Sequence, residues 1–312
     1  MKVFIRALAF GIASYVPWLR RRNEKGTRGT ISARYCYSVW LRHLVMAHEN
    51  GLNNAPNVVA ELGPGDSLGI GLSALLSGSE QCFAFDIVEH TDVEKNLEVF
   101  DELVRLFEAR HPIPDDDEFP RVRPKLADYG FPSHILDEAR LALALHENRL
   151  DRIRDSILNM KSSGSMIEYK TPWYEEGVLQ TSSVDMIFSQ AVLEHVDALE
   201  SAYGTMYAWL KPAGYMSHTI DFKCHATADQ WNGHWRYPDW QWRLIRGNRP
   251  YIINREPHST HTKFLKEKEF RIVFDQKVHT KSQIAKHRLA KKFRSMSDED
   301  LDTSGAFIQA TK

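Results

Sequence analysis

Cysteine is scarce in this sequence and neither sign of charge is in excess, and both features narrow the classes of protein to consider. Its 312 residues include three cysteines, Cys36, Cys82 and Cys224, whose separations match no metal-binding motif. Three cysteines cannot all pair within one chain, and free thiols are typical of a reducing compartment, so a cytoplasmic protein is predicted. The net charge of −1 provides no broadly basic surface, and no nucleic-acid partner is predicted.

A long hydrophobic run is also missing. The N-terminal apolar stretch, residues 7–19, is shorter than the roughly 20 residues that a membrane-spanning helix needs. The strongest basic cluster follows it, at residues 20–28, and no small-residue cleavage site is evident, so a signal peptide is disfavoured. Two interpretations stay open: a helix docked on the rest of the protein, which we favour, and a helix that lies on a membrane surface.

Short apolar runs alternate with longer helical patterns, and no internal repeat or low-complexity linker separates them. Runs of strand type cover residues 58–62, 81–86, 166–169, 184–189, 215–221, 271–278 and 306–311. Helical patterns cover residues 32–50, 68–76, 91–110, 135–160, 197–210 and 264–269, and the basic segment 277–294 is predicted as a solvated helix. This alternation predicts an α/β fold in which helices cover both faces of a parallel sheet.

The first apolar run ends in a turn rich in glycine and acid, Glu61-Leu62-Gly63-Pro64-Gly65-Asp66. Glycine allows the backbone to pass close to a ligand because no Cβ blocks the approach. A second apolar run ends at Asp86, 21 residues after Gly65. In doubly wound folds, an acid at the tip of the second strand holds the ribose diol of a nucleoside.

Two kinds of ligand fit this turn, and its charges separate them. In the dinucleotide fingerprint G-x-G-x-x-G the third glycine comes three residues after the second, whereas here Gly69 comes four residues after Gly65. The carboxylates of Glu61 and Asp66 would repel a pyrophosphate but attract a ligand with a positively charged sulfur and an amino group. A nicotinamide-dependent oxidoreductase is therefore disfavoured.

Three segments resemble the class I S-adenosylmethionine-dependent methyltransferases. Residues 58–66 resemble their motif I, and Asp86 matches their ribose-binding acid. Residues 183–196 resemble motif IV, and residues 209–214 resemble the helix end and turn before the fifth strand. The resemblance covers roughly residues 52–312. It implies a Rossmann-like, doubly wound, mostly parallel seven-stranded sheet with helical insertions, and S-adenosyl-L-methionine as cofactor.

The resemblance also implies cofactor contacts at six positions: Glu61, Gly63, Gly65, Asp86, Ser189 and Gln190. The first three would line the methionine end, Asp86 would bind the ribose hydroxyls, and the last two would lie under the sulfonium. The adenine contact is expected from residues 168–169.

The acceptor side is predicted at the end of the fifth strand, because residues at the carboxyl ends of strands face the ligand crevice. His218 and Asp221 are the first candidates for acceptor binding and general base, and His195 is the rival. A histidine at a strand end can equally satisfy polar groups of the core. The irregular spacing of the histidines favours no metal site.

The remaining predictions concern the domains and the acceptor. Residues 1–51 are predicted as an N-terminal helical extension, and residues 52–312 as the methyltransferase domain, with insertions at about 87–165 and 222–263 that form a lid. The second insertion is rich in aromatic residues and arginine, which suit sugar rings and anions. Trp235, Arg236 and Tyr237 are its predicted substrate contacts, although a lid whose tryptophans form a core would show the same composition.

The most favoured reaction is therefore O-methylation of a sugar or glycan, and a looser resemblance points to methyltransferases of bacterial surface-polysaccharide pathways. A small metabolite or a lipid quinone would suit the same cofactor site. A non-catalytic nucleotide-binding protein of this fold is the alternative of a different class. Peripheral membrane contact through the N-terminal helix stays possible, but a helix docked on the rest of the protein is the favoured interpretation. The sequence leaves the oligomeric state open.

Overall fold

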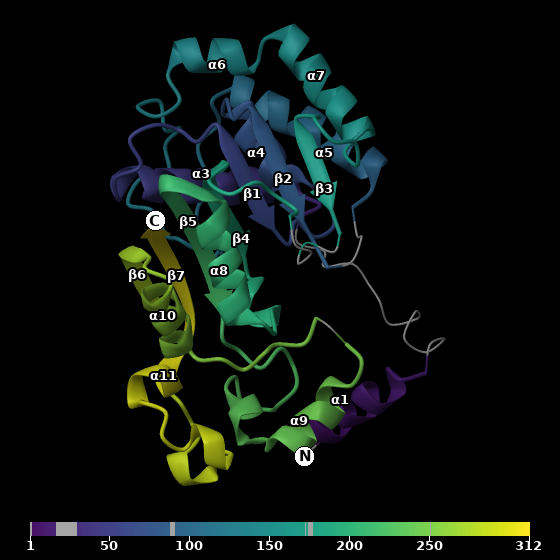
Figure 1. The fold of residues 1–312 in the computed structure, drawn as a ribbon, viewed down its shortest axis with the longest axis vertical. Helices are drawn as coiled ribbons and strands as arrows, with labels where there is room; N and C mark the ends of the chain where they lie inside the picture. The colour runs from purple at the N-terminus through teal and green to yellow at the C-terminus, as the bar shows by residue number, and fades with distance from the viewer. Residues whose placement is uncertain (1, 17–29, 88–90, 172, 174–176, 250) are drawn as a thin grey trace.

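The structure is a computed structural model, and it describes residues 2–16, 30–87, 91–171, 173, 177–249 and 251–312. Within these residues, seven strands form one sheet in the order β3-β2-β1-β4-β5-β7-β6 (Figure 1). The strands are β1 (Val58–Leu62), β2 (Gln81–Phe85), β3 (Ile167–Lys170), β4 (Val184–Gln190), β5 (Leu210–Asp221), β6 (Arg271–His279) and β7 (Thr303–Thr311). The predicted strands are thus present, and the fold class is confirmed.

The register of the sheet creates a reversal of strand order between β1 and β4. β1 pairs in parallel with β2 on one side, where Glu61 lies opposite Ala84, and with β4 on the other, where Glu61 lies opposite Phe188. β7 runs antiparallel to both β5 and β6, so the sheet is mostly but not wholly parallel. In open α/β sheets, ligands bind beyond the carboxyl ends of the strands at such a reversal point. The fold therefore directs attention to the loops that follow β1, β2, β4 and β5.

Two of the longest helices begin at residues whose side chains cap them. In α3 (Ala33–Glu49), the side chain of Ser32 accepts a hydrogen bond from the backbone N–H of Tyr35. In α5 (Val93–Glu108), the side chain of Asp92 accepts a hydrogen bond from the backbone N–H of Lys95. The other α-helices are α1 (Lys2–Ala13), α4 (Gly69–Leu76), α6 (Glu138–Ala144), α7 (Glu147–Leu158), α8 (Leu199–Trp209), α9 (Asp239–Arg246), α10 (His258–Glu267) and α11 (Asp298–Asp302).

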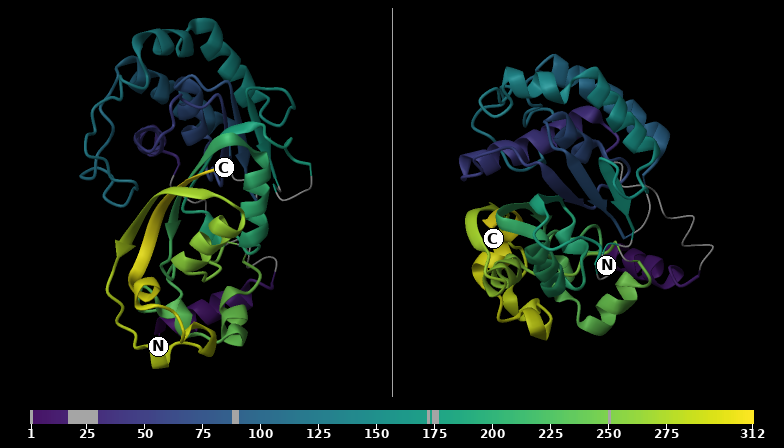
Figure 2. Two further views of the ribbon diagram at one scale, coloured as in Figure 1. Left: turned by 60° about the vertical axis from the view of Figure 1, so that its left-hand side comes forward. Right: turned by 45° about the horizontal axis from the view of Figure 1, so that its top comes forward.

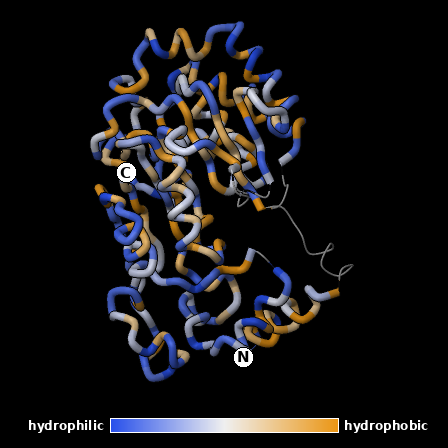
Figure 3. Tube along the Cα trace, viewed as in Figure 1, coloured by the Kyte–Doolittle hydropathy of each residue, from blue (hydrophilic) through white to orange (hydrophobic). Residues whose placement is uncertain are grey.

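Helices cover both faces of the sheet, as the right-hand view of Figure 2 shows. On one face, here called the α3 face, α3, α4 and α5 pack against one another and bury the side chains of one alternate set of strand residues. On the opposite face, the α8 face, α8 and α10 bury the other set. Hydrophobic residues gather along the central strands (Figure 3), and β1, β2 and β4 are buried along most of their length, which is typical of a sheet covered by helices on both faces.

The predicted N-terminal extension divides into two parts with different packing. α3 belongs to the main core: Tyr37, Trp40 and Leu44 are fully buried, and the Trp40 indole donates a hydrogen bond to Ser77 at 2.8 Å. α1 instead packs on α9 of the second insertion (Figure 1). The contact between α1 and α9 is tight, because a Cβ added to Gly11 would lie 2.0 Å from the carbonyl oxygen of Leu244. The basic cluster at residues 20–28 lies outside the described residues.

The two insertions lie on different parts of the sheet. α5, α6 and α7 of the first insertion extend the α3 face. The buried Arg42 of α3 holds the loop after α5 by donating hydrogen bonds to the carbonyl of Pro114 and to the carboxylate of Asp116, at 2.9 and 3.0 Å. The second insertion follows β5 at the carboxyl edge of the sheet and contains α9. Only the second insertion starts beside the predicted acceptor residues, so the name lid is kept below for residues 222–263.

One predicted element is wrong. Residues 277–294 form no helical face: they comprise the end of β6 and two short 3-10 turns, Lys286–Arg288 and Lys291–Phe293. Leu289 and Phe293 from this segment are buried with Trp235 of the lid, so tertiary packing replaces helical hydrogen bonding here. Among the described residues, no helix has the length and apolar character that crossing a membrane requires.

Candidate active site

The glycine turn after β1 has the backbone conformation that its sequence predicts. Gly63 and Gly65 have φ values of +66° and +75°, a region that favours glycine. A Cβ at Gly63 would lie 2.5 Å from a methyl carbon of Val192, in the loop after β4. The turn after β1 and the loop after β4 are therefore in direct contact at the reversal point of the sheet.

Glu61 is the most unusual group near this turn. Its side chain lies on the α3 face, is 1% exposed and accepts a hydrogen bond from the N–H of Gly71, in the first turn of α4, at 3.0 Å. Burial, reinforced by the nearby charge of Asp86, raises its pKa to about 8. A buried carboxyl of this kind gains from a cation that enters beside it. Its environment fits a positively charged ligand better than a phosphate.

Asp86 follows β2 directly and is 8% exposed. One of its oxygens accepts a hydrogen bond from the backbone N–H of Ile87 at 2.7 Å, which fixes the carboxylate at the strand end. The parallel register places Leu62, the last residue of β1, opposite Phe85, immediately before Asp86. The structure thus brings Glu61, Gly63 and Asp86 to one edge of the sheet, as the sequence predicts.

Ser189 and Gln190, the predicted sulfonium neighbours, lie on opposite faces at the end of β4. Ser189 is fully buried, and its hydroxyl is 2.7 Å from Nδ1 of His218. Gln190 is partly exposed, and its side-chain oxygen is 3.2 Å from Nε2 of His43 on α3. Both side chains have polar partners within the protein. Their predicted roles toward a cofactor stay predictions.

His218, the first candidate for the general base, lies inside the α8 face. Its side chain is on the same face of β5 as those of Met216 and Ile220, two positions before and after it, and both of these belong to the core of that face. The ring is fully buried, and burial lowers its pKa to about 3. This environment suits the alternative that the sequence left open, a histidine that satisfies polar groups of the core. Its Nε2 has no hydrogen-bond partner among the described residues.

Asp221 and His195 lie closer to the predicted crevice, in the loops that follow β5 and β4. Asp221 accepts hydrogen bonds from the backbone and ammonium nitrogens of Lys223, at 2.9 and 3.1 Å. Burial opposes ionisation of Asp221, but His225 and Lys223 outweigh it and hold its pKa at about 2. Burial, followed by the nearby His225, lowers the pKa of His195 to about 4. Both groups are therefore unprotonated at neutral pH, the state that a general base requires, although such low pKa values make each of them a weak base.

The structure adds two residues to this group that the sequence interpretation did not select. Glu194 precedes His195 in the 3-10 turn Leu193–His195, and it is 2% exposed. The ring of His225, from the lid, lies 5.1 Å from that of His195 between centroids. Burial is the main cause that raises the pKa of Glu194. Glu194 is part of the segment that resembles motif IV. The sequence gave no reason to select it, because only the fold brings it close to His225, 31 positions later.

The three predicted substrate contacts differ in exposure. Trp235 is fully buried and donates a hydrogen bond from its indole to the backbone of Arg255 at 2.9 Å, so it belongs to the core of the lid. Tyr237 is partly buried, with its ring 5.2 Å from that of Phe4 in α1. Arg236 is exposed. Of the three, Arg236 has the position of a surface contact.

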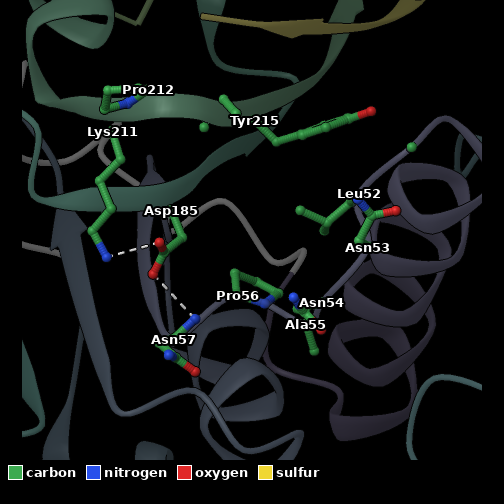
Figure 4. A pocket seen from close by; sticks show the side chains of 13 residues that line it. Leu52, Asn53, Asn54, Ala55, Pro56, Asn57, Asp185, Lys211, Pro212 and Tyr215 are labelled. Atoms are coloured by element: carbon green, nitrogen blue, oxygen red, sulfur yellow. Dashed lines mark hydrogen bonds and ion pairs between the residues drawn. The ribbon is translucent and has the colours of Figure 1, made fainter.

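A pocket of about 330 Å³ lies at the opposite edge of the sheet (Figure 4). It is lined by the loop after α3 and by the first residues of β4 and β5, where Lys211 pairs with Asp185 at 2.8 Å. These are the amino ends of the strands, where doubly wound sheets do not bind their ligands. The pocket is therefore separate from the candidate active site.

Comparison with known proteins gives a partial match. A family model described as a methyltransferase domain matches residues 141–217, about a quarter of the chain, which include β3, β4, α8 and the start of β5. No curated protein matches.

Several solved structures have a similar arrangement. A putative sarcosine dimethylglycine methyltransferase from Galdieria sulphuraria has a TM-score of 0.45 and 12% identity, over 88% of this chain and 84% of that one. A SAM-dependent methyltransferase from Methanosarcina mazei has a TM-score of 0.44 and 12% identity, over 86% and 96%. Another, from Mesorhizobium loti, has a TM-score of 0.41 and 13% identity, over 83% and 92%. Likeness at this level carries no conclusion about substrate.

The matched segment contains the strands and the helix that lead to the loop of Glu194 and His195. The sheet order supplies the reversal point beside which the glycine turn and Asp86 lie. Residues 141–217 thus match a methyltransferase domain, in line with the predicted enzyme class, and the glycine turn and Asp86 at the reversal point fit the predicted methyl donor, S-adenosylmethionine.

Proposed function

We propose that this enzyme methylates a hydroxyl group of a sugar or glycan. The observation that supports this most is the grouping of proton-accepting side chains, Asp221 and His195, beside the loop that contacts the glycine turn. An alcohol is a poor nucleophile until its proton leaves, so its methylation needs such a group.

The residues at the carboxyl edge fit the methyl donor. Asp86 supplies negative charge, the buried carboxyl of Glu61 can ionise when a cation enters beside it, and Gly63 lets the turn after β1 pack closely against Val192. When bound, S-adenosylmethionine supplies a methyl group on a cationic sulfur; transfer forms the O–CH3 bond, breaks the C–S bond, leaves a neutral thioether and releases the acceptor proton to a base. The protein's main contribution is to hold the acceptor oxygen in line with that methyl group.

The exposed surface of the lid supports a sugar acceptor. Trp240 is 62% exposed and Tyr251 is 46% exposed, and the charged Arg236 is also at the surface. Exposed aromatic rings stack on sugar rings, and arginine binds the carboxylates or phosphates that many glycans carry.

Methyl transfer to fractionated acceptors tests the proposal. The purified enzyme is incubated with radiolabelled S-adenosylmethionine and a cell extract that has been separated into glycans, lipids and small molecules. Label is expected in the glycan or lipid-linked glycan fraction, and treatment with a glycosidase should convert it to a methylated monosaccharide. Label found only in small molecules or quinones would contradict the sugar acceptor, and absence of label with intact cofactor binding would favour a non-catalytic binding protein.

Replacing Asp86 with alanine tests the ribose assignment. The ribose hydroxyls would lose their partner in a buried site, so the binding free energy of S-adenosylmethionine should weaken by about 1–3 kcal/mol. Isothermal titration calorimetry measures the change directly. Asp101→Ala is the control, because Asp101 is an exposed carboxylate of α5 that pairs with Arg154. Equal cofactor affinity of Asp86→Ala and the wild type would rule out the assignment.

Glu61 should make stability depend on pH. Its pKa is about 8 in the folded protein and near 4.5 in the unfolded chain. The folded state therefore keeps a proton that the unfolded state has lost, and the free energy of unfolding should fall as pH rises from 5 to 8. Glutamine has no carboxyl group to titrate, so the Glu61→Gln variant should lose less stability between pH 5 and pH 8. The difference in the decrease of the free energy of unfolding should be on the order of 3 kcal/mol. Urea unfolding at pH 5 and pH 8 measures it, and equal pH dependence of the two proteins would contradict the prediction.

We further propose a cytoplasmic enzyme that contacts a membrane surface through α1 and α9. Ile5 and Ile12 of α1 are 57% and 53% exposed, and Trp240 and Leu244 of α9 are exposed on the same substructure. Arg243, also exposed, adds positive charge that suits anionic lipid headgroups.

The double variant Ile5→Ser/Ile12→Ser should sediment less with vesicles that contain phosphatidylserine. We expect at least a threefold loss of bound fraction, since two exposed apolar side chains are removed from the contact. The double variant Leu143→Ser/Leu158→Ser is the control: those leucines are exposed on α6 and α7, far from α1 (Figure 1). Equal vesicle binding by the two double variants would overturn the proposed surface.

A further inference from the structure

Three side chains of ligand type converge beside the glycine turn. Glu194, His195 and His225 each offer one ligand atom, and these three atoms lie within 4.8 Å of one another. We propose that they bind a divalent transition-metal cation, such as Zn²⁺, Mn²⁺ or Co²⁺. The proposal rests on the proposed function and deepens it: such a cation would hold the acceptor oxygen, and with His195 as a ligand Asp221 would be the group that accepts the proton. The irregular spacing of the histidines in the sequence gave no sign of this site.

The first support comes from Glu194. Its side chain is almost wholly buried, yet neither carboxylate oxygen has a well-aligned hydrogen-bond partner within the described residues; the backbone N–H groups of Glu194 and Asp221 lie near enough only to oppose part of the rise in its pKa that burial causes. Nδ1 of His195 likewise has no well-aligned hydrogen-bond partner within the described residues. Buried polar atoms without partners are rare in folded proteins, because each one costs its desolvation free energy. Buried carboxylates without a protein partner commonly bind a metal ion instead.

The second support comes from the backbone. His225 and Ala226 have φ values of +46° and +59°, in the left-handed region that non-glycine residues rarely adopt. Strained backbone of this kind gathers at functional sites. The strain occurs where the chain enters the lid. It holds Nε2 of His225 3.5 Å from Oδ2 of Asp221. In many metal sites a carboxylate in this position orients the histidine that binds the metal.

The third support is the rigidity of the loop that carries the other two ligands. Asn254 of the lid donates its backbone N–H to the carbonyl of Glu194 at 2.6 Å, and its side chain donates to the carbonyls of Leu193 and Val196 at 2.9 and 2.8 Å. A clamped loop fixes ligand positions at low entropic cost. The side chain of His225 is 29% exposed, which provides an entry path and the freedom to close the remaining gap to metal-bond lengths.

The ligand set decides the class of cation. Two imidazoles and one carboxylate suit Zn²⁺, Mn²⁺, Co²⁺ or Fe²⁺, whereas Mg²⁺ prefers oxygen ligands alone. Three protein ligands leave a position open, as in catalytic zinc sites, and a hydroxyl oxygen can occupy it. Val192, two residues before Glu194, touches the glycine turn. The open position would therefore border the site of the methyl donor.

Metal binding by the full-length protein tests the site without any acceptor or cofactor. The protein is treated with a chelator, dialysed and titrated with Co²⁺ followed by visible absorption, and with Zn²⁺ by calorimetry. One equivalent of each should bind, with a Co²⁺ spectrum of low coordination number, and Mg²⁺ should not compete. Failure of the wild type to bind any of these ions stoichiometrically would overturn the proposal.

Two histidine variants make the test specific. His225→Asn should lower Zn²⁺ affinity at least tenfold, and asparagine tolerates the left-handed backbone at this position, so the fold should persist. His279→Asn removes an exposed histidine at the end of β6 and should bind Zn²⁺ as the wild type does. Equal affinity of the two variants would refute the site.

Glu194→Gln provides a second, isosteric variant. It should bind Co²⁺ more weakly and change its absorption spectrum, because a charged oxygen ligand is lost. An unchanged spectrum and affinity would remove Glu194 from the ligand set and with it the proposed site. Metal binding that persists while methyl transfer to glycans fails would contradict the proposed function but leave the cation site standing, and the converse result would do the opposite.

Discussion

The burial of carboxyl groups at the carboxyl edge of the sheet is the constraint on which the site depends. Glu61 is in the middle of the sheet, between β2 and β4, and water cannot stabilise its charge there. A protein optimised for stability alone would place an apolar residue at this position. The hydrogen bond from Gly71 offsets part of the cost of burial, and a cation such as the predicted methyl donor would offset more of it. The stability of the fold and the affinity of the site therefore oppose each other at this residue.

The lid is coupled to this edge through polar contacts rather than through apolar packing alone. Asn254 makes three hydrogen bonds to the turn that contains Glu194, and His225 enters the same region from the other end of the lid. The lid also carries α9, on which α1 packs. A contact of α1 with a lipid surface would therefore be transmitted to the segment that holds the candidate acceptor residues, and a lipid-linked acceptor would use both surfaces at once.

Local pattern predicted most of the fold, whereas long-range packing decided what it could not. The apolar runs, the caps at Ser32 and Asp92 and the glycine turn at Gly63 are each encoded within a few residues, and all appear in the structure. The segment 277–294 was predicted wrongly as a helix because its charge pattern does not show that Phe293 is needed by the core of the lid. The position of His218 was missed for a similar reason. Its place in β5 directs its side chain to the α8 face, but only the packing of α10 on that face buries it, and the sequence of β5 alone does not show this packing.

The candidate acceptor site shows the same division more sharply. Glu194 and His195 are adjacent in sequence, but neither is distinctive until the carboxyl group proves to be buried without a well-aligned hydrogen-bond partner among the described residues. His225 joins them only because β5 runs parallel to β4 and ends beside it, so that the chain turns back over the preceding loop. A sequence interpretation searches for ligands at regular intervals, which local helices and turns produce. Ligands contributed by two separate loops at one edge of a parallel sheet have no such interval. The topology that creates the cofactor crevice is thus also what assembles the second set of charged groups next to it.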